Sequence, residues 1–332
     1  MVMYVFGAGA SLHAGYPLTT ELGNRLHIWA QQAEFTGGGF IDEIHQLYEG
    51  LTDLERILTE LYDRPQGSRA ATLTRMHCGN IIGALNTAIP EYFYSLSEIP
   101  IQSRDLYGEL ARGKFQNGDT IITFNYDLAC EHALKLEGAW EIGDGYGFSL
   151  GVGMTPPSKT KLLKLHGSTN WLGVLFGGKK GFSHVSNGIY DLRPCLFGER
   201  YFTYLGYSKD FRDPLCKGIS TTGGEPALIL PALHKNFFQQ TSFGREWEPF
   251  WDDIWGQAAQ ALQSSDKNVV IGYSMPEADE RARELLMRSN PEAEILVFSG
   301  SNSKRICNDF RSCGFTKVKS FERSHFEDFL AT

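Results

Sequence analysis

Short apolar runs alternate with stretches of helical periodicity along most of the chain. Six runs have the length and composition of buried strands: residues 1–6, 119–124, 161–165, 227–231, 268–271 and 295–298. Between them, apolar residues recur every three or four positions, which predicts amphipathic helices. Short buried strands that alternate with helices are typical of a parallel sheet covered on both faces. The pattern therefore predicts an α/β fold with a doubly wound, Rossmann-like parallel sheet.

Two segments interrupt this alternation. Residues 37–118 carry no strand signal and have helical spacing throughout, including a long helix that we expect to end before Pro90. Residues 171–225 are rich in glycine and aromatic residues without a helical period, so we expect hairpins and loops there. We predict one domain over 1–332, with a Rossmann-like core at 1–36, 119–170 and 226–332, a helical insertion at 37–118 and a small subdomain at 171–225.

A stripe of large apolar residues marks the helix that follows the run at 227–231. Trp247, Trp251 and Trp255 share one face of this helix with smaller apolar residues. We interpret the stripe as core or interface rather than as a platform for stacking nucleic-acid bases. The helix around Trp247–Trp255, including this face, and the helical insertion are candidate docking surfaces for a partner.

The composition argues against several classes of protein. The net charge of −8 over 332 residues does not favour nucleic-acid binding, which requires a basic surface. No apolar run approaches the roughly 18 residues of a membrane span. The first strand begins at Met1 with no signal peptide before it, so we expect a cytoplasmic protein. None of the six cysteines is spaced as Cys-x-x-Cys, which indicates reduced thiols and no zinc module.

Polar clusters follow five of the predicted strands. Ligands of doubly wound sheets bind at the carboxyl ends of the strands, so we expect these clusters to converge on one cleft. They are Gly7–Ser11, Asn125–Asp127, His166–Ser168, Gly272–Ser274 and Ser299–Asn302.

The first cluster, Gly7–Ser11, is a glycine-rich turn directly after a strand. Such a turn lets the backbone approach a phosphate, and the N–H groups of the next helix point at the anion. It departs from the dehydrogenase fingerprint, because Leu12 stands where a third Gly or Ala belongs. A Walker lysine is also missing. The alternative is a plain strand-to-helix turn without a ligand.

Three side chains in the middle of the chain are candidates for chemistry. Asn125 directly follows its strand, where an amide can hold a ribose hydroxyl or a water. Asp127 has two equal readings, a functional one and a helix cap, since Asp is a favoured capping residue. His166 also ends a strand, and imidazole is suited to proton transfer near neutral pH. His13, close to the glycine turn, is a weaker candidate.

These residues together resemble the motifs of sirtuins. Gly7–Ser11 with Gly15–Pro17 is similar to their cofactor loop, and Thr123–Asp127 is similar to their Gln-Asn-x-Asp segment, with Phe for Gln. Leu165–Gly167 resembles the segment that carries their catalytic histidine. Gly272–Asp279 resembles the late Gly-x-Ser loop of bacterial SIR2-like proteins. The order of the motifs agrees along nearly the whole chain.

The resemblance implies a sirtuin-type sheet and chemistry on NAD, with no metal. It implies that Asn125 holds the nicotinamide ribose and the attacking water, that Asp127 helps to place the carboxamide, and that His166 acts as general base. It assigns the pyrophosphate and the rest of the cofactor to Gly7, Ala8, Gly9, Ala10, Ser11, Gly272 and Ser274, with Ser299 near the adenosine ribose.

Two departures from sirtuin deacylases narrow the expected activity. The four zinc cysteines are missing, and Leu18-Thr19-Thr20 follows Pro17 where deacylases carry Asp-Phe-Arg. SIR2-like proteins without these features are associated with NAD hydrolysis in bacterial anti-phage defence. We therefore expect an NAD glycohydrolase, gated by self-assembly or a partner protein because unregulated hydrolysis would be toxic. The alternatives are an NAD-dependent deacylase or ADP-ribosyltransferase, and a non-enzymatic subunit that binds NAD or ADP-ribose.

Overall fold

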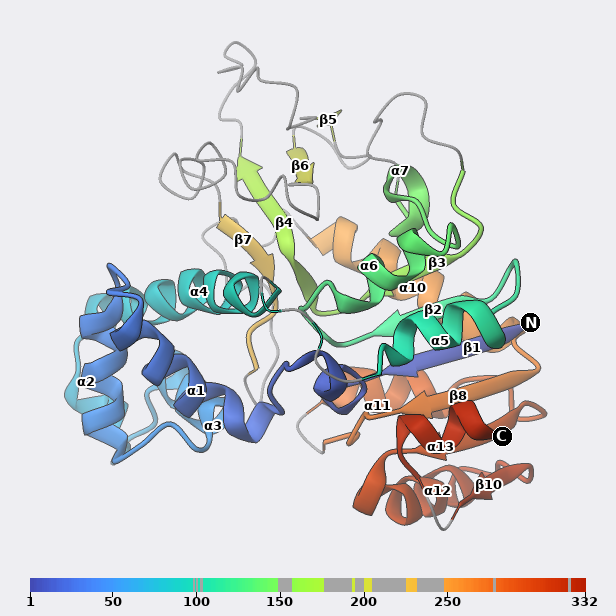
Figure 1. The fold of residues 1–332 in the computed structure, drawn as a ribbon. Helices are drawn as coiled ribbons and strands as arrows, with labels where there is room; N and C mark the ends of the chain where they lie inside the picture. Colours follow the sequence, from blue (N-terminus) through green and yellow to red (C-terminus); the bar gives the residue numbers. More distant parts are fainter. Residues whose placement is uncertain are drawn as a thin grey trace.

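The computed structural model describes residues 1–97, 99, 101, 104–148, 157–175, 193–194, 200–204, 225–231, 248–276, 279–321 and 324–332. A six-stranded parallel sheet forms the centre of this described part (Figure 1). Its strands are β1 (Val2–Phe6), β2 (Thr120–Thr123), β3 (Lys161–Lys164), β8 (Lys267–Ile271), β9 (Glu294–Phe298) and β10 (Val318–Ser320).

The order of the strands across this sheet is β10-β9-β8-β1-β2-β3, and every neighbouring pair is parallel. Numbered among themselves along the chain, the strands follow the Rossmann order 3-2-1-4-5-6. The order reverses between β1 and β8, and this is the point where such sheets bind ligands. The predicted doubly wound parallel sheet is confirmed.

Helices cover both faces of the sheet. In Figure 1, α5 (Leu106–Gly113), α6 (Ala129–Leu136) and α13 (Phe326–Ala331) lie in front of the sheet, and α10 (Glu248–Ser264) and α11 (Glu280–Met287) lie behind it. The helix α12 (Ser303–Ser312) packs on β9 and β10. Because both faces are covered, the central strands β1, β8 and β9 are mostly apolar, and in each of them every residue after the first is buried.

The aromatic stripe on α10 packs into this core. Trp251 and Trp255 are only 2% and 6% exposed, and Ile254 between them is fully buried. The prediction of core is confirmed for these residues, whereas the candidate docking surface on the same face is wrong because the chain itself covers it. Trp247 lies outside the described residues.

The elements α1 (Thr19–Gln32), α2 (Gly38–Tyr48), α3 (Leu54–Asp63) and α4 (Arg75–Ser97) form a second body with its own hydrophobic cluster. It lies to one side of the sheet in Figure 1. The buried residues of α1 belong to the hydrophobic cluster of this helical body, whereas the buried residues of α5 belong to the hydrophobic cluster of the sheet. The sequence prediction had divided the chain differently, with 1–36 in the core and 37–118 in the insertion.

Helix α4 continues through Pro90, although the sequence predicted an end before it. Proline removes one helical hydrogen bond and normally destabilises a helix interior. Here the turn beyond it is held by tertiary packing, since Tyr92 lies 5.7 Å from Trp29 and Phe93 lies 5.4 Å from Tyr16, measured between ring centroids. Burial of these rings offsets the cost of the proline.

A smaller antiparallel sheet has the order β5-β6-β4-β7 and comprises β4 (Gly167–Leu175), β5 (Arg193–Pro194), β6 (Arg200–Tyr204) and β7 (Glu225–Leu228). The run at 227–231, predicted as a core strand, instead contributes to β7 in this second sheet. The rest of the predicted subdomain at 171–225 lies outside the described residues. No described helix has both the length and the apolar character needed to span a membrane.

A fully buried ion pair links β3 to α6, the helix that follows β2. The Nζ of Lys164, on β3, lies 2.7 Å from the Oε1 of Glu131 on α6, and both side chains are 0% exposed. The same ammonium donates to the carbonyl oxygens of Tyr126 and Asp127. The pair therefore anchors the turn that follows β2. Burial raises the pKa of Glu131, and the nearby Lys164 ammonium opposes that rise.

We predict that Lys164→Met lowers the free energy of unfolding by about 3–5 kcal/mol, because it leaves the Glu131 carboxylate buried without its counter-ion. The double variant Lys164→Met/Glu131→Leu removes both charges and should regain much of this loss. Urea denaturation followed by tryptophan fluorescence measures both. A double variant that is less stable than Lys164→Met contradicts the mutual dependence of the two charges.

Candidate active-site cavity

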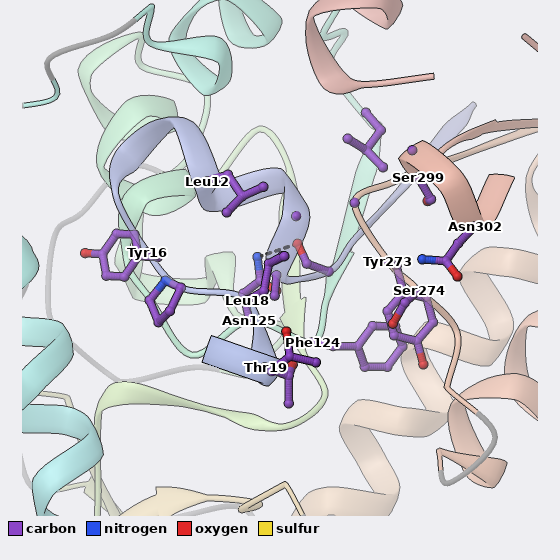
Figure 2. A pocket seen from close by; sticks show the side chains of 18 of the residues that line it. Leu12, Tyr16, Leu18, Thr19, Phe124, Asn125, Tyr273, Ser274, Ser299 and Asn302 are labelled. Carbon is purple, nitrogen blue, oxygen red and sulfur yellow. Dashed lines mark hydrogen bonds between the residues drawn. The ribbon is translucent and has the colours of Figure 1, made fainter. Parts of the chain in front are cut away.

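A cavity of about 1130 Å³ opens at the carboxyl ends of β1, β2, β8 and β9, where the strand order reverses. Its wall includes residues of four of the five predicted clusters and the His166 end of the fifth. Figure 2 shows Ser299, Asn302 and Ser274 at one side and Leu12 and Tyr16 at the other. The helical body contributes Thr52–Glu55 and Phe93.

Not every residue of the predicted clusters reaches the cavity wall. Gly7, Ala8 and Gly9 line the cavity, whereas Ala10 and Ser11 are buried beneath it. Ser168 is also fully buried and absent from the wall. Ser11 therefore does not face the cavity, and it would influence a ligand only through the side chains that it contacts.

The glycines of the first cluster are required by the packing of two loops. The turn after β1 becomes a short 3-10 helix, η1 (Ala8–Ala14). A Cβ on Gly7 would lie 2.5 Å from the Cα of Tyr273, and a Cβ on Gly9 would lie 2.9 Å from the Cα of Gly272. Gly272 itself has a φ of +62° and would place a Cβ 2.1 Å from the nitrogen of Ala10. Side chains at these positions would force the two loops apart.

Main-chain hydrogen bonds hold the same two loops together. The N–H of Gly7 donates to the carbonyl of Ile271 at 3.1 Å, and the N–H of Gly9 donates to the carbonyl of Gly272 at 2.9 Å. The N–H of Ala10 donates to Gly7. These three groups are therefore engaged within the chain, and an anion at this loop would need other donors. The sequence had suggested a simpler phosphate cradle.

Hydroxyl and amide groups supply such donors at the far side of the cavity. Ser274, Ser299 and Asn302 line this wall (Figure 2). The Oγ of Ser299 is buried and has no hydrogen-bond partner among the described residues. Arg305 donates to the carbonyls of Ser274 and Met275, which fixes the loop after β8. A ligand hydroxyl or phosphate oxygen would satisfy the Ser299 hydroxyl, since buried polar groups are normally paired.

The amide of Asn125 is held in one orientation. Its Nδ2 donates to the carbonyl of Gly7 at 2.9 Å and to the Oγ of Ser11 at 3.0 Å. Because the Gly7 carbonyl can only accept, the nitrogen must face it, which leaves the Oδ1 as the acceptor for a ligand. Ser11 is in turn 2.9 Å from the hydroxyl of Tyr107. This chain of contacts explains why a serine ends the glycine turn.

Asp127 precedes Leu128, the N-cap of the following helix, bonds the first N–H of that helix and also lines the cavity. Its Oδ1 accepts a hydrogen bond from the N–H of Ala129 at 3.0 Å, at the start of α6. The side chain is buried, and it lies in the wall beside Asn125. The two readings of Asp127 from the sequence are therefore compatible in this structure.

His166 lies where the chain passes from β3 of the large sheet to β4 of the small one. Its ring centroid is 5.0 Å from that of Phe124. The Nε2 is 3.5 Å from the Oδ2 of Asp279, which also accepts a hydrogen bond from the hydroxyl of Tyr273 at 3.0 Å. Asp279 ends the Gly272–Asp279 motif, and the sequence alone assigns it no role. Its position before α11 was the available signal.

His13, the weaker candidate, packs beneath the glycine turn. Its Nδ1 is 2.9 Å from the carbonyl of Ala10, and its ring contacts those of Tyr107 and Phe326 edge-on. Burial lowers the pKa of this imidazole. These contacts brace η1; burial favours the neutral ring, whereas the contact with the Ala10 carbonyl opposes that effect.

The charges in the described part of the cavity wall are mainly acidic. No Lys or Arg belongs to it. The wall includes the carboxylates of Asp53, Glu55, Asp127, Asp279, Glu327 and Asp328. Such a wall favours a ligand with a positively charged group and leaves any phosphate to hydroxyl, amide and backbone donors. Among the described residues, no group of three or more His, Cys, Asp or Glu could hold a metal ion, and Cys195 and Cys216 lie outside them.

The sequence matches no protein-family model, and no curated protein is significantly similar to it. Solved structures of Sir2 proteins are similar to the chain. Sir2Tm bound to a propionylated peptide has 12% identity and a TM-score of 0.36, over 100% of this chain and 90% of that one. A Sir2 homolog–NAD complex has 12% identity and a TM-score of 0.35, over 94% and 88%. These identities and TM-scores are low, and the function proposed below follows from the cavity and the motifs.

We predict that Gly272→Ala destabilises the protein more than Gly314→Ala does. Both glycines have positive φ, at +62° and +94°, so both variants carry the left-handed strain of about 1–2 kcal/mol. Nothing lies within 4 Å of a Cβ on Gly314, whereas a Cβ on Gly272 meets the backbone of Gly9 and Ala10. The clash adds about 1–3 kcal/mol. Urea denaturation of both variants checks this, and equal losses would contradict the packing of the two loops.

Proposed function

We propose that the protein is an NAD glycohydrolase that converts NAD and water to nicotinamide and ADP-ribose. The observation that carries this proposal is the convergence of the glycine loop, Asn125 and His166 on one cavity where the strand order reverses. This is where doubly wound sheets bind nucleotides. The resemblance of the same residues to the sirtuin motifs, in the same order, supports NAD as the ligand.

The residues divide the work as follows. The Oδ1 of Asn125, left as an acceptor by the fixed amide, would hold a ribose hydroxyl or the attacking water. His166 would take a proton from that water as general base. Gly7, Ala8, Gly9, Gly272, Ser274 and Ser299 line the cavity and would face the diphosphate and adenosine, with hydrogen-bond donors supplied by Ser274 and Ser299.

The chemistry breaks the glycosidic C–N bond and forms a C–O bond. The bonding electron pair leaves with the nicotinamide nitrogen, so the positive charge moves from the pyridinium ring to the ribose. The water oxygen then bonds to the ribose carbon, and its proton passes to His166. An acidic cavity wall stabilises the cationic ribose as it develops, since electrostatic stabilisation is usually the largest single contribution to catalysis.

We predict that the purified protein releases nicotinamide from NAD with no peptide present, and that Asn125→Ala and His166→Ala each lower kcat by about a hundredfold or more. Chromatography of nicotinamide and ADP-ribose measures turnover. Asn308→Ala and His132→Ala, at exposed positions away from the cavity, are the matched controls and should keep wild-type turnover.

The outcome also separates the alternatives. Release of nicotinamide only when an acyl-lysine peptide or another acceptor is added supports a deacylase or ADP-ribosyltransferase. Tight binding of NAD or ADP-ribose without turnover, unchanged in His166→Ala, supports a binding subunit. Either result contradicts a glycohydrolase.

We further propose that the enzyme is an effector of bacterial anti-phage defence whose activity is gated. Continuous rapid hydrolysis of NAD would harm the host cell, so the activity of the resting protein must be kept low. Self-assembly or a partner protein would release it. NAD depletion would then stop the infected cell from supporting the phage.

Gating predicts that the specific activity rises with protein concentration or on addition of the partner. Gating by self-assembly is tested by measuring nicotinamide release over a hundredfold range of protein concentration. Light scattering on the same samples reports the oligomeric state. A monomer that is fully active at every concentration would contradict both forms.

A further inference from the structure

We infer that Asp279 is the positioning residue for His166: its carboxylate orients the imidazole at the cavity wall and stabilises the charged ring, and the Tyr273 hydroxyl anchors that carboxylate. The inference rests on the proposed function, because Asp279 acts through the general base that the function assigns to His166. It gives a role to the carboxylate at the start of α11.

The geometry places the two side chains in direct contact. The Nε2 of His166 and the Oδ2 of Asp279 are 3.5 Å apart, and their side chains are only 5% and 3% exposed. This distance is long for a hydrogen bond, as catalytic contacts often are before substrate is bound. Both residues line the cavity, so the pair lies at the site of reaction.

Tyr273 fixes the carboxylate from the opposite side. Its hydroxyl donates to the Oδ2 of Asp279 at 3.0 Å, and burial keeps the tyrosine pKa well above its usual value, so the hydroxyl stays a donor. The tyrosine ring stacks on Phe124 with 4.3 Å between centroids, as the adjacent rings in Figure 2 show. Phe124 in turn contacts His166, which closes a ring of four side chains.

Phe124 therefore has a structural reason to differ from the glutamine of sirtuins. An aromatic ring at this position fills the space between His166 and Tyr273.

The charged groups around the imidazole favour this role for Asp279. Arg281, on α11, lies over the ring of Trp255 at 4.4 Å, and that ring is 6.4 Å from His166. Arg283 and Glu55 act on Tyr273 at longer range. Of these groups, Asp279 is the one in contact with the imidazole, and its place before the first turn of α11 favours the ionised carboxylate.

The consequence for the reaction concerns a single proton. When His166 takes a proton from water, the ring becomes a cation inside a buried site. Asp279 stabilises that cation and so raises the affinity of the ring for the proton. The Asp279 carboxylate itself gains no proton and forms no covalent bond in this step.

The first test is kinetic and uses the full-length protein with NAD. Asp279→Asn keeps the shape of the side chain and should lower kcat about tenfold or more with little change in KM. The acidic limb of kcat/KM should move to lower pH, because loss of the carboxylate lowers the pKa of His166. Asp252→Asn removes an exposed carboxylate that pairs with Arg281, and it should change neither quantity.

The second test needs no activity. NMR titration of the histidine ring protons reports the pKa of His166, whose signal among the nine histidines is the one lost in His166→Gln. The His166 pKa should fall by about one unit in Asp279→Asn. Tyr273→Phe, which keeps the stacked ring, should give a smaller fall and remains informative if Asp279→Asn does not fold.

The outcomes are separable. A lower His166 pKa in the variants of a protein that releases no nicotinamide supports the pairing and contradicts the proposed hydrolase. An unchanged His166 pKa, or Asp279→Asn with wild-type kcat and pH profile, overturns the pairing even if the protein hydrolyses NAD. A variant that raises KM alone and keeps the pH profile also overturns it, because that pattern indicates a structural role.

Discussion

The backbone contact between the loops after β1 and β8 is the constraint on which the cavity depends. It involves no side chains: two N–H groups of the first loop donate to carbonyls at the end of β8 and in its loop. Glycine at 7, 9 and 272 is what permits the approach. The amide of Asn125 then attaches the loop after β2 to the same point through the Gly7 carbonyl. Three strand ends are thus joined before any ligand is bound, and this preorganisation lowers the cost of binding.

The second constraint acts at His166, which lies in the two-residue turn between β3 of the large sheet and β4 of the small sheet. The N–H of Leu165 donates to Thr123 in the large sheet, and the carbonyl of His166 accepts from Ile229 beside the small sheet. The buried ammonium of Lys164, two residues before His166, donates to two main-chain carbonyls after β2. The backbone on either side of the imidazole is therefore fixed by hydrogen bonds. The side chain retains only its own rotation, which contact with Asp279 and Phe124 restricts further.

The sequence predicted the parallel sheet well because the strands are short, rich in apolar residues and, in most cases, directly followed by polar clusters. It also predicted which clusters would lie together, since that follows from strand direction alone. It failed where tertiary packing decides: Pro90 is tolerated because the rings beyond it are buried, and 227–231 joins the second sheet. The role of the glycines as a contact between loops was equally hidden, because the partner of Gly9 lies more than two hundred residues away in the sequence. Asp279 was missed for the same reason.

The register of β1 has a consequence for how the protein is made. Val2 pairs with Lys267 and Phe6 pairs with Ile271, so β1 must wait for β8, which is synthesised more than 260 residues later. Contacts of such sequence separation form slowly, and the N-terminal part of a multi-element chain folds first during translation. A nascent chain that ends before about residue 270 lacks Gly272, which packs against the glycine loop, and also lacks the cavity wall that follows β8. Copies that end before this point consequently cannot assemble the cavity.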